Sequence, residues 1–223
     1  MLKLTAENIK SYLANTPQIT FEITEACNLS CLYCGYGKLY NNKGERHHRR
    51  MPSENAIAFL NYLKELWDAG YDNRGEGTLS SSFYGGEPLL NMQFIKTVIC
   101  YIEEKLQGVR RHFVYTMTTN AIFLPKYMDY LVSKDIHLLV SLDGDEKGSS
   151  CRVYHDGEPA FSDITKSISK LRNKYPRFFE KNVEFNSVLT RKTSVKEITD
   201  YIYHTYGKTP SISEVNTDGV NPQ

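Results

Sequence analysis

The residues best suited to chemistry are three closely spaced cysteines, Cys27, Cys31 and Cys34, which directly follow a short apolar segment. Three thiolates separated by three and then two residues can each hold one iron of a [4Fe-4S] cluster, so that the fourth iron keeps an open position. Among metal sites, an open position is typical of catalytic rather than structural centres. The spacing therefore predicts a cluster whose spare iron is available to a ligand.

A structural zinc site is the main alternative for the same cysteines, with His47 or His48 as the fourth ligand. Structural zinc sites usually contain two CxxC pairs, and this sequence has no second pair. A chance cluster of reduced thiols is a further alternative. We favour the iron-sulfur cluster because the spacing suits it best.

The composition is that of a globular protein without a strong charge bias. The 223 residues are enough for one sizeable domain and too few for two comfortable ones. The 27 basic and 26 acidic residues give a net charge of +1, which argues against nucleic acid as the general partner. Sixteen tyrosines and ten phenylalanines supply enough apolar surface to argue against a disordered chain.

The sequence favours a cytoplasmic protein that is not inserted in a membrane. The first residues lack the apolar run of a signal peptide, and no 18-residue apolar segment occurs. The cysteine count of five is odd, and three of the five fall within eight residues, which indicates a reducing compartment. An exposed low-potential cluster would also favour an anaerobic cell.

Apolar periodicity predicts that strands and helices alternate along the chain. Residues 1–17 are expected to be an N-terminal extension that contains a helix over residues 5–14, capped by Thr5. A second helix is expected behind a Ser53 cap. The remaining predicted helices span residues 91–106, 125–134, 161–175 and 195–206. The predicted strands span residues 18–24, 78–84, 112–118, 137–142, 182–189 and 211–216.

This order of elements predicts an α/β fold of parallel strands with right-handed crossovers, which can curve into an open partial barrel. The residues of chemical interest all follow strands: the cysteines the first strand, Glu87 the second, Asn120 the third, and Ser141 with Asp143 the fourth. In parallel α/β folds these strand ends share the face that carries the site. We therefore expect these residues to converge.

Three motifs together resemble the radical S-adenosylmethionine (radical SAM) superfamily. They are the CxxxCxxC segment with the aromatic Tyr33 before its last cysteine, the sequence Gly85-Gly86-Glu87-Pro88, and the sequence Ser141-Leu142-Asp143-Gly144. The resemblance implies a TIM-like partial (βα)6 barrel over residues 18–223, apparently truncated at the sixth strand. It also implies two cofactors, a [4Fe-4S] cluster and S-adenosylmethionine.

The resemblance also implies a role for each site residue. Cys27, Cys31 and Cys34 would hold the cluster, and Tyr33 would lie along the adenine. Gly86 and Glu87 would bind the ammonium group of S-adenosylmethionine, with Gly85 completing the Gly-Gly pair that lets a ligand approach the backbone. The further cofactor-binding candidates are Asn120, and Ser141 with Arg152 at the carboxylate. For Arg152, an exposed loop arginine is the alternative.

The closest subgroup resemblance, through the cysteine segment, the segment Tyr84-Gly85-Gly86-Glu87-Pro88 and Ser141-Leu142-Asp143-Gly144, is to enzymes that modify peptides or proteins. These include maturases of ribosomal peptides and anaerobic sulfatase maturases. They usually continue into a cysteine-rich SPASM-type domain with auxiliary clusters, whereas this sequence has no cysteine after Cys151. The expected partners are a peptide or protein substrate and an electron donor such as flavodoxin or ferredoxin.

The implied reaction begins with an electron from the cluster, which cleaves S-adenosylmethionine and yields a 5′-deoxyadenosyl radical that takes hydrogen from the substrate. The cofactors carry this chemistry. A catalytically incomplete iron-sulfur or peptide-binding fragment of such a maturase is the alternative that belongs to a different functional class.

Four smaller features are interpreted from the sequence alone. Ala121 stands where the family often has glycine, which argues against a left-handed turn there. The basic run at residues 45–50 is expected to be a solvated turn, with an acidic or phosphate contact as the alternative. Cys100 is expected in the core. Cys151 needs no function, although an extra ligand or a substrate-side thiol is conceivable.

Overall fold

The computed structural model describes residues 4–37, 39–40, 48–73, 77–216 and 218–220. Much of the predicted loop over residues 35–50, including His47 and half of the basic run, lies outside the described residues. In the rest of that run, Arg49 is exposed and pairs with Glu25 at 2.7 Å between Nη2 and Oε1.

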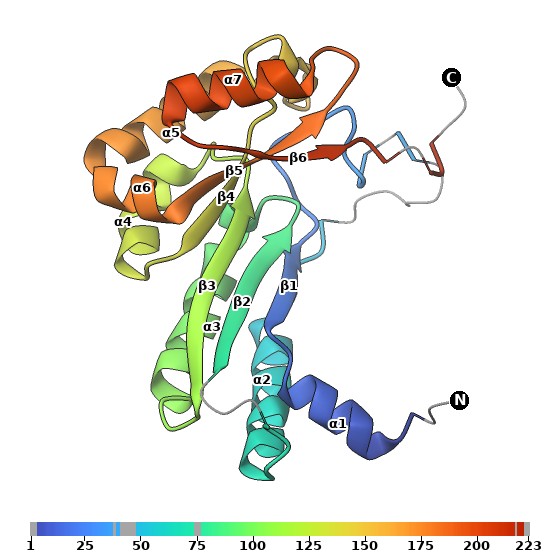
Figure 1. Cartoon of the computed structure of the whole chain (residues 1–223), viewed down its shortest axis with the longest axis vertical. Helices are drawn as coiled ribbons and strands as arrows, with labels where there is room; N and C mark the ends of the chain where they lie inside the picture. Colours follow the sequence, from blue (N-terminus) through green and yellow to red (C-terminus); the bar gives the residue numbers. More distant parts are fainter. Residues whose placement is uncertain (1–3, 38, 41–47, 74–76, 217, 221–223) are drawn as a thin grey trace.

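The described residues form a six-stranded, wholly parallel sheet whose spatial order follows the chain order (Figure 1). Its strands are β1 (Gln18–Thr24), β2 (Gly77–Gly85), β3 (Arg111–Thr119), β4 (His137–Ser141), β5 (Val183–Leu189) and β6 (Ser211–Glu214). The sheet twists strongly between β3 and β5 (Figure 1). This confirms the predicted α/β fold with a partial barrel of parallel strands.

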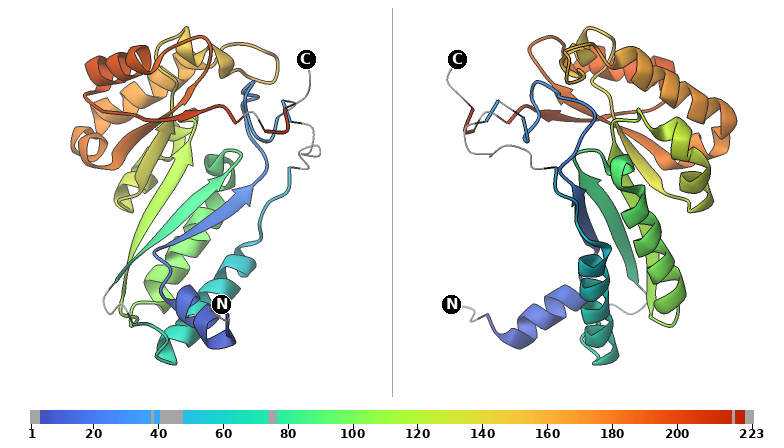
Figure 2. Two further views of the ribbon diagram at one scale, coloured as in Figure 1. Left: turned by 45° about the vertical axis from the view of Figure 1, so that its right-hand side comes forward. Right: turned by 180° about the vertical axis from the view of Figure 1, so that it is seen from behind.

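The helices between the strands cover one face of the sheet (Figure 2). They are α2 (Ser53–Asp68), α3 (Met92–Lys105), α4 (Leu124–Ser133), α5 (Phe161–Lys174), α6 (Pro176–Asn182) and α7 (Val195–Tyr206). Helix α1 (Ala6–Ala14) precedes the sheet and packs against α2. Two short 3-10 turns, η1 (Pro88–Asn91) and η2 (Gly148–Cys151), follow β2 and β4.

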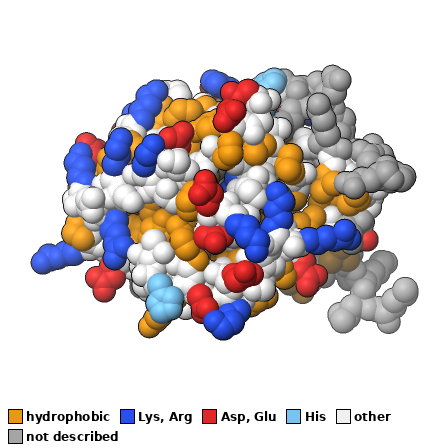
Figure 3. Space-filling view, turned by 90° about the horizontal axis from the view of Figure 1, so that it is seen from above, with side chains coloured by type: hydrophobic (Ala, Val, Ile, Leu, Met, Phe, Trp, Pro, Cys, Tyr) orange, Lys and Arg blue, Asp and Glu red, His pale blue; other side chains and the backbone are white. Residues whose placement is uncertain are grey.

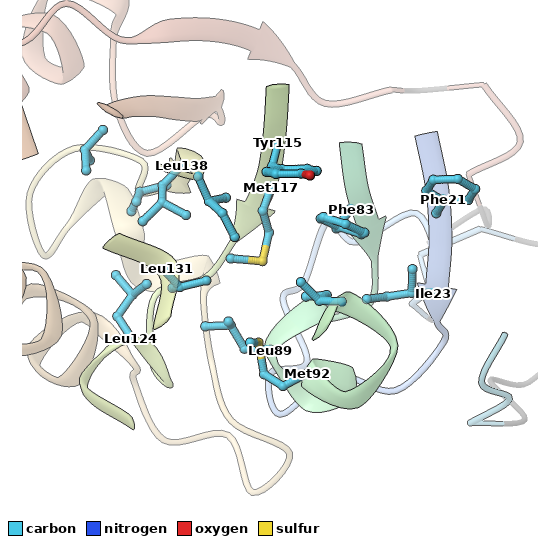
Figure 4. Packing of buried hydrophobic residues seen from close by; sticks show 14 of the residues in the cluster. Phe21, Ile23, Phe83, Leu89, Met92, Tyr115, Met117, Leu124, Leu131 and Leu138 are labelled. Atoms are coloured by element: carbon cyan, nitrogen blue, oxygen red, sulfur yellow. The ribbon is translucent and has the colours of Figure 1, made fainter. Parts of the chain in front are cut away.

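The core fills the space between the sheet and these helices. On β1, the buried Ile19, Phe21 and Ile23 alternate with exposed polar residues, as a strand with one covered face requires. Phe21 stacks on Phe83 of β2 with ring centroids 6.3 Å apart, and further apolar side chains from β3 and α3 complete the layer (Figure 4). Burying each such side chain contributes about 1.5–3 kcal/mol.

The sequence prediction missed α6, and its expectations for the Ser53 cap and for the burial of Cys100 were wrong. Pro176 begins α6 directly after α5, and Phe178 and Phe179 anchor this helix in the core. Ser53 is the first residue of α2 and makes no capping hydrogen bond, whereas Thr5 caps α1 as predicted. The predicted core position of Cys100 is wrong, because the neighbouring Ile99 occupies the buried face of α3 and Cys100 is exposed.

The outer surface carries charges of both signs. On the face shown in Figure 3, basic and acidic side chains are interspersed rather than gathered by sign, in line with the net charge of +1. Within the described ranges, we find no helix whose length and apolarity would let it cross a membrane.

At the end of the sheet where the strands begin, a buried arginine joins α1, α2 and β3. The Nη2 atom of Arg111 lies 2.7 Å from Asp72 Oδ1 and 2.8 Å from the carbonyl oxygen of Ala14. The side chains of Arg111 and Asp72 are only 2% and 10% exposed. The guanidinium also lies 5.9 Å from the centroid of the Trp67 ring.

Replacing Asp72 with alanine should lower the free energy of unfolding by about 3 kcal/mol, because it leaves the buried Arg111 cation without its counterion. Asp68→Ala is the matched control, since Asp68 pairs with Lys64 on an exposed helix face and should contribute little. Urea denaturation of both variants measures the difference. Equal stabilities would show that the Arg111 pair is not a structural anchor.

Candidate functional site

A cavity of about 490 Å³ opens at the carboxyl ends of the strands. This volume lies within the range of about 300 to 1,000 Å³ that is usual for small-molecule sites. Nine of the ten site residues predicted from the sequence line it: Cys27, Cys31, Tyr33, Cys34, Gly85, Gly86, Asn120, Ser141 and Arg152. The tenth, Glu87, lies behind the cavity wall, where it is fully buried.

The loop that carries the three cysteines is held in place by the chain segment of residues 151–155. The backbone N–H groups of Ser30 and Leu32 donate to the carbonyl oxygens of Val153 and Cys151 at 2.7 and 2.9 Å. His155 Nε2 lies 2.9 Å from the carbonyl oxygen of Cys27. These contacts order the loop through the protein's own backbone.

The sulfur of Cys27 receives two hydrogen bonds from its surroundings. The backbone N–H of Leu29 donates to Cys27 Sγ at 3.4 Å, and Asn120 Nδ2 donates to the same sulfur at 3.8 Å. Hydrogen bonds of this kind stabilise thiolates and metal-bound sulfur. All five cysteines belong to the described part of the chain, and none forms a disulfide.

The electrostatics of the cysteines fit a cationic cluster. Burial raises the pKa of the Cys31 thiol to about 11; Arg152 opposes this shift, whereas Cys34 and Cys27 add to it. A thiolate at Cys31 is therefore disfavoured unless a positive group lies nearby, and the iron of a cluster would supply one. Among the described residues, which do not include His47, no three His, Cys, Asp or Glu side chains are arranged around one common metal ion. A cubane instead takes each thiolate on a different iron.

The Gly85-Gly86 turn presses against the start of the cysteine loop. Gly86 N and Glu87 N donate to the carbonyl oxygens of Thr24 and Ala26 at 2.7 and 2.8 Å. A Cβ atom on Gly86 would lie 2.2 Å from the carbonyl oxygen of Ala26, so only glycine fits there. The pair thus brings two loops together and exposes backbone to the cavity.

The Glu87 carboxylate is hydrogen-bonded to other groups of the protein. It accepts hydrogen bonds from Leu89 N at 3.0 Å, Thr119 Oγ1 at 2.8 Å and Asn120 N at 2.8 Å. Burial raises its pKa to about 7, although all three hydrogen bonds oppose this shift. The predicted direct contact with the ammonium group stays a prediction. In the structure, the carboxylate holds the turn after β3.

That turn departs from the expectation for Ala121. The residue adopts a left-handed conformation with φ of +69°, so the prediction that alanine would prevent such a turn is wrong. The side chains of Thr119 and Asn120 accept from the backbone N–H groups of Ala121 and Ile122, each at 3.1 Å, and offset the cost of about 1–2 kcal/mol. Asn120 is thereby aimed at Asn28 Oδ1, 2.9 Å away.

Arg152 is not the exposed loop arginine of the alternative interpretation. Its side chain is 6% exposed, and its Nε and Nη2 atoms lie 3.0 and 2.7 Å from the two oxygens of Asp143. The guanidinium also lies 5.6 Å from the centroid of the Tyr33 ring. Cys151, next to it, is buried and contributes its carbonyl oxygen to the cysteine loop, but it does not line the cavity.

Several lining residues were missed by the sequence analysis. They are Leu29, Gly35, Tyr36, Tyr84, Thr118, Thr119, Asn186, Val188 and Ser213. Many of them sit on the strands at positions whose side chains face away from the helices. The alternation of apolar and polar residues along the strands was the available signal, since it places Thr118 opposite Met117 and Asn186 opposite Phe185, on the uncovered face.

Comparison with known sequences identifies a shared domain. A family model described as "Radical SAM superfamily" matches residues 21–202. The chain is 29% identical over 198 residues to radical SAM cyclopropyl synthase TigE of Paramaledivibacter caminithermalis, covering 85% of this chain and 37% of the relative. It is 26% identical over 196 residues to a cysteine-type anaerobic sulfatase-maturating enzyme of Clostridium novyi, covering 82% and 45%. The chain thus spans less than half the length of these two relatives.

Solved structures share the fold. Native anSMEcpe with bound AdoMet matches with a TM-score of 0.70 at 20% identity, covering 89% of this chain and 52% of that chain. The same protein with bound AdoMet and the Cp18Cys peptide matches with a TM-score of 0.68, covering 89% and 50%. At this level of identity, the likeness establishes the common architecture.

Gly86→Ala should destabilise the protein by about 1–3 kcal/mol, because the added methyl group collides with the backbone of Ala26 and forces the two loops apart. Gly108→Ala is the matched control, since nothing lies within 4 Å of its added Cβ. Thermal unfolding of both variants compares them. If Gly86→Ala unfolds at the same temperature as Gly108→Ala, the Gly85-Gly86 turn and the cysteine loop are not tightly packed against each other.

Glu87 should make stability depend on pH. Its folded pKa of about 7 exceeds the ordinary carboxyl value, so the folded state binds the proton more tightly and loses stability as the pH rises from about 4.5 to about 7. The loss is at most about 1.4 kcal/mol per pH unit. Chemical denaturation across this range, compared with Glu87→Gln, isolates the effect. A difference between the two proteins that stays constant with pH would contradict it.

Proposed function

Because the chain belongs to the radical SAM superfamily, we propose that it reductively cleaves S-adenosylmethionine at a [4Fe-4S] cluster in order to modify a peptide or protein. One observation carries this proposal: three cysteines, a Gly-Gly turn and a buried arginine, from the segments after β1, β2 and β4, line a single cavity. When bound, the reduced cluster and S-adenosylmethionine together supply the electron and the hydrogen-abstracting power.

The chain's own residues bind and orient these groups. Cys27, Cys31 and Cys34 would each hold one iron. The Gly85-Gly86 backbone would receive the ammonium end of S-adenosylmethionine, because its missing side chains leave room for close approach. Further cofactor contacts are assigned to Tyr33 and Asn120, and to Ser141 with Arg152 for the carboxylate. The strand ends and the cysteine loop around the cavity would limit the access of water to the reacting atoms.

A peptide or protein substrate is supported by the relatives rather than by a contact in this chain. One relative is named a sulfatase-maturating enzyme, and one structural neighbour holds a peptide. Next to the cavity, the uncovered face of the sheet has a hollow lined partly by hydrogen-bonding side chains, where a peptide segment could lie. We further propose a cytoplasmic, anaerobic setting, a flavodoxin or ferredoxin as electron donor, and an association with auxiliary SPASM-type clusters.

Anaerobic reconstitution tests the proposal. The protein should bind about four irons and four sulfides per chain, and after reduction with dithionite it should convert S-adenosylmethionine to 5′-deoxyadenosine. Cys31→Ala should lose the cluster and the cleavage, because one corner of the cubane has no ligand. Cys100→Ala is the control and should keep both, since Cys100 is exposed on α3. Iron analysis and chromatography of the nucleoside products give the two readouts.

The outcomes separate the candidate functions. A coloured protein that never cleaves S-adenosylmethionine is the incomplete fragment, and a colourless protein that binds zinc stoichiometrically contradicts the cluster. The substrate class is tested by transfer of deuterium from a deuterated peptide into 5′-deoxyadenosine. Transfer from small metabolites, but from no peptide or protein, would overturn the peptide assignment.

A further inference from the structure

A buried carboxylate, Asp143, joins three walls of the cavity. Its side chain is fully buried, and its oxygens accept from Arg152 Nε at 3.0 Å, Arg152 Nη2 at 2.7 Å and Val188 N at 2.8 Å. The hydroxyl group of Tyr33 donates to the same carboxylate. Tyr33 belongs to the cysteine loop, Arg152 to the segment after β4, and Val188 to β5. One side chain therefore connects all three.

The backbone around Asp143 is built to hold it. Its N–H donates to Ser149 Oγ at 3.2 Å, and Ser149 Oγ in turn donates to the carbonyl oxygen of Gly144 at 3.1 Å. A Cβ atom on Gly148 would lie 2.3 Å from the carbonyl oxygen of Asp143, so the turn closes tightly on this residue. These contacts give the carboxylate a fixed position that does not depend on any bound group.

The pairing with Asp143 uses one whole edge of the Arg152 guanidinium. An arginine whose Nε–H and one Nη2–H are already engaged keeps three N–H donors for a ligand, namely the second on Nη2 and both on Nη1. The pair is also buried, so solvent screens its charges only weakly. Arg152 and Asp143 therefore act on their surroundings as two fixed and opposite charges.

These two charges lie beside the cysteine loop. Arg152 lines the cavity together with Cys31 and Cys34, and both members of the pair contact Tyr33, the residue before Cys34. A cation near a cluster favours its more negative, reduced form, and an anion disfavours it. With both charges present, the Asp143 carboxylate therefore offsets part of the effect of the Arg152 guanidinium.

We propose that Asp143 is a positioning residue that holds Arg152 against the cysteine loop and offsets its charge there, so that the pair tunes the reduction potential of the cluster. This inference rests on the proposed function, because it requires the cluster to be present. It assigns to Asp143 an electrostatic role in addition to its structural contacts. The role predicts a shift whose sign is fixed by the uncancelled charge.

The test measures the midpoint potential of the reconstituted cluster in two variants. Asp143→Asn keeps the size of the side chain but leaves the Arg152 cation uncancelled, so the potential should move in the positive direction. The double variant Asp143→Asn/Arg152→Gln removes both charges, so the positive shift of the single variant should disappear. Asp129→Asn is the control, because it unpairs Lys174 at an exposed position on α4 and should leave the potential unchanged.

Two results would overturn the inference: an Asp143→Asn potential equal to that of the unchanged protein, or a double variant shifted as far as the single one.

If Asp143→Asn does not retain its cluster, thermal unfolding decides instead. A buried unpaired cation is destabilising, so removing Arg152 as well should restore stability, whereas a double variant no more stable than the single one contradicts charge cancellation. If the unchanged protein binds no cluster, that result contradicts the proposed function itself.

Discussion

The parallel alignment of the strands, in an order that follows the chain, is the constraint on which the rest of the structure depends. Because neighbours in sequence are neighbours in space, the loops after β1, β2, β3 and β4 border one another along a single edge of the sheet. Each loop contributes a different chemical group to the cavity: thiols, exposed backbone, an amide and a guanidinium. A change of strand order would separate these groups.

Close backbone contacts convert this alignment into a defined site. On one side, the Gly85-Gly86 turn bonds to the carbonyl oxygens of Thr24 and Ala26. On the other side, residues 151–155 pair with the cysteine loop. The loop is therefore ordered from both sides by protein contacts alone. Its conformational entropy is then largely lost on folding rather than on cofactor binding, which is how a preorganised site gains affinity.

Much of the architecture could be predicted from sequence because it depends on local periodicity. The alternation along β1 and the apolar spacing of α2, α3 and α7 are properties of consecutive residues. The convergence of the cysteines with Gly86, Asn120 and Ser141 followed from the order of strands. Short elements were harder to predict: α6 has too few residues for a periodic signal, and Pro176 at its start was the main cue.

What could not be predicted depends on contacts between distant parts of the chain. The sequence shows that Glu87 follows a strand, but only the packing against Thr119 and Asn120 turns its carboxylate inward. Similarly, Arg152 is buried because Asp143 is already fixed by its own turn. For Ala121, side-chain hydrogen bonds outweigh a backbone preference, so the residue type alone misleads.

Three thiols of this loop are proposed to hold a cluster with one iron open to S-adenosylmethionine. Mössbauer spectroscopy of protein reconstituted with iron-57 tests this arrangement most directly, because each iron of the cluster contributes separately to the spectrum. Adding S-adenosylmethionine should change the signal of about one iron in four and leave the others as they were. A spectrum in which no iron responds, or in which all four already have protein ligands, would contradict it.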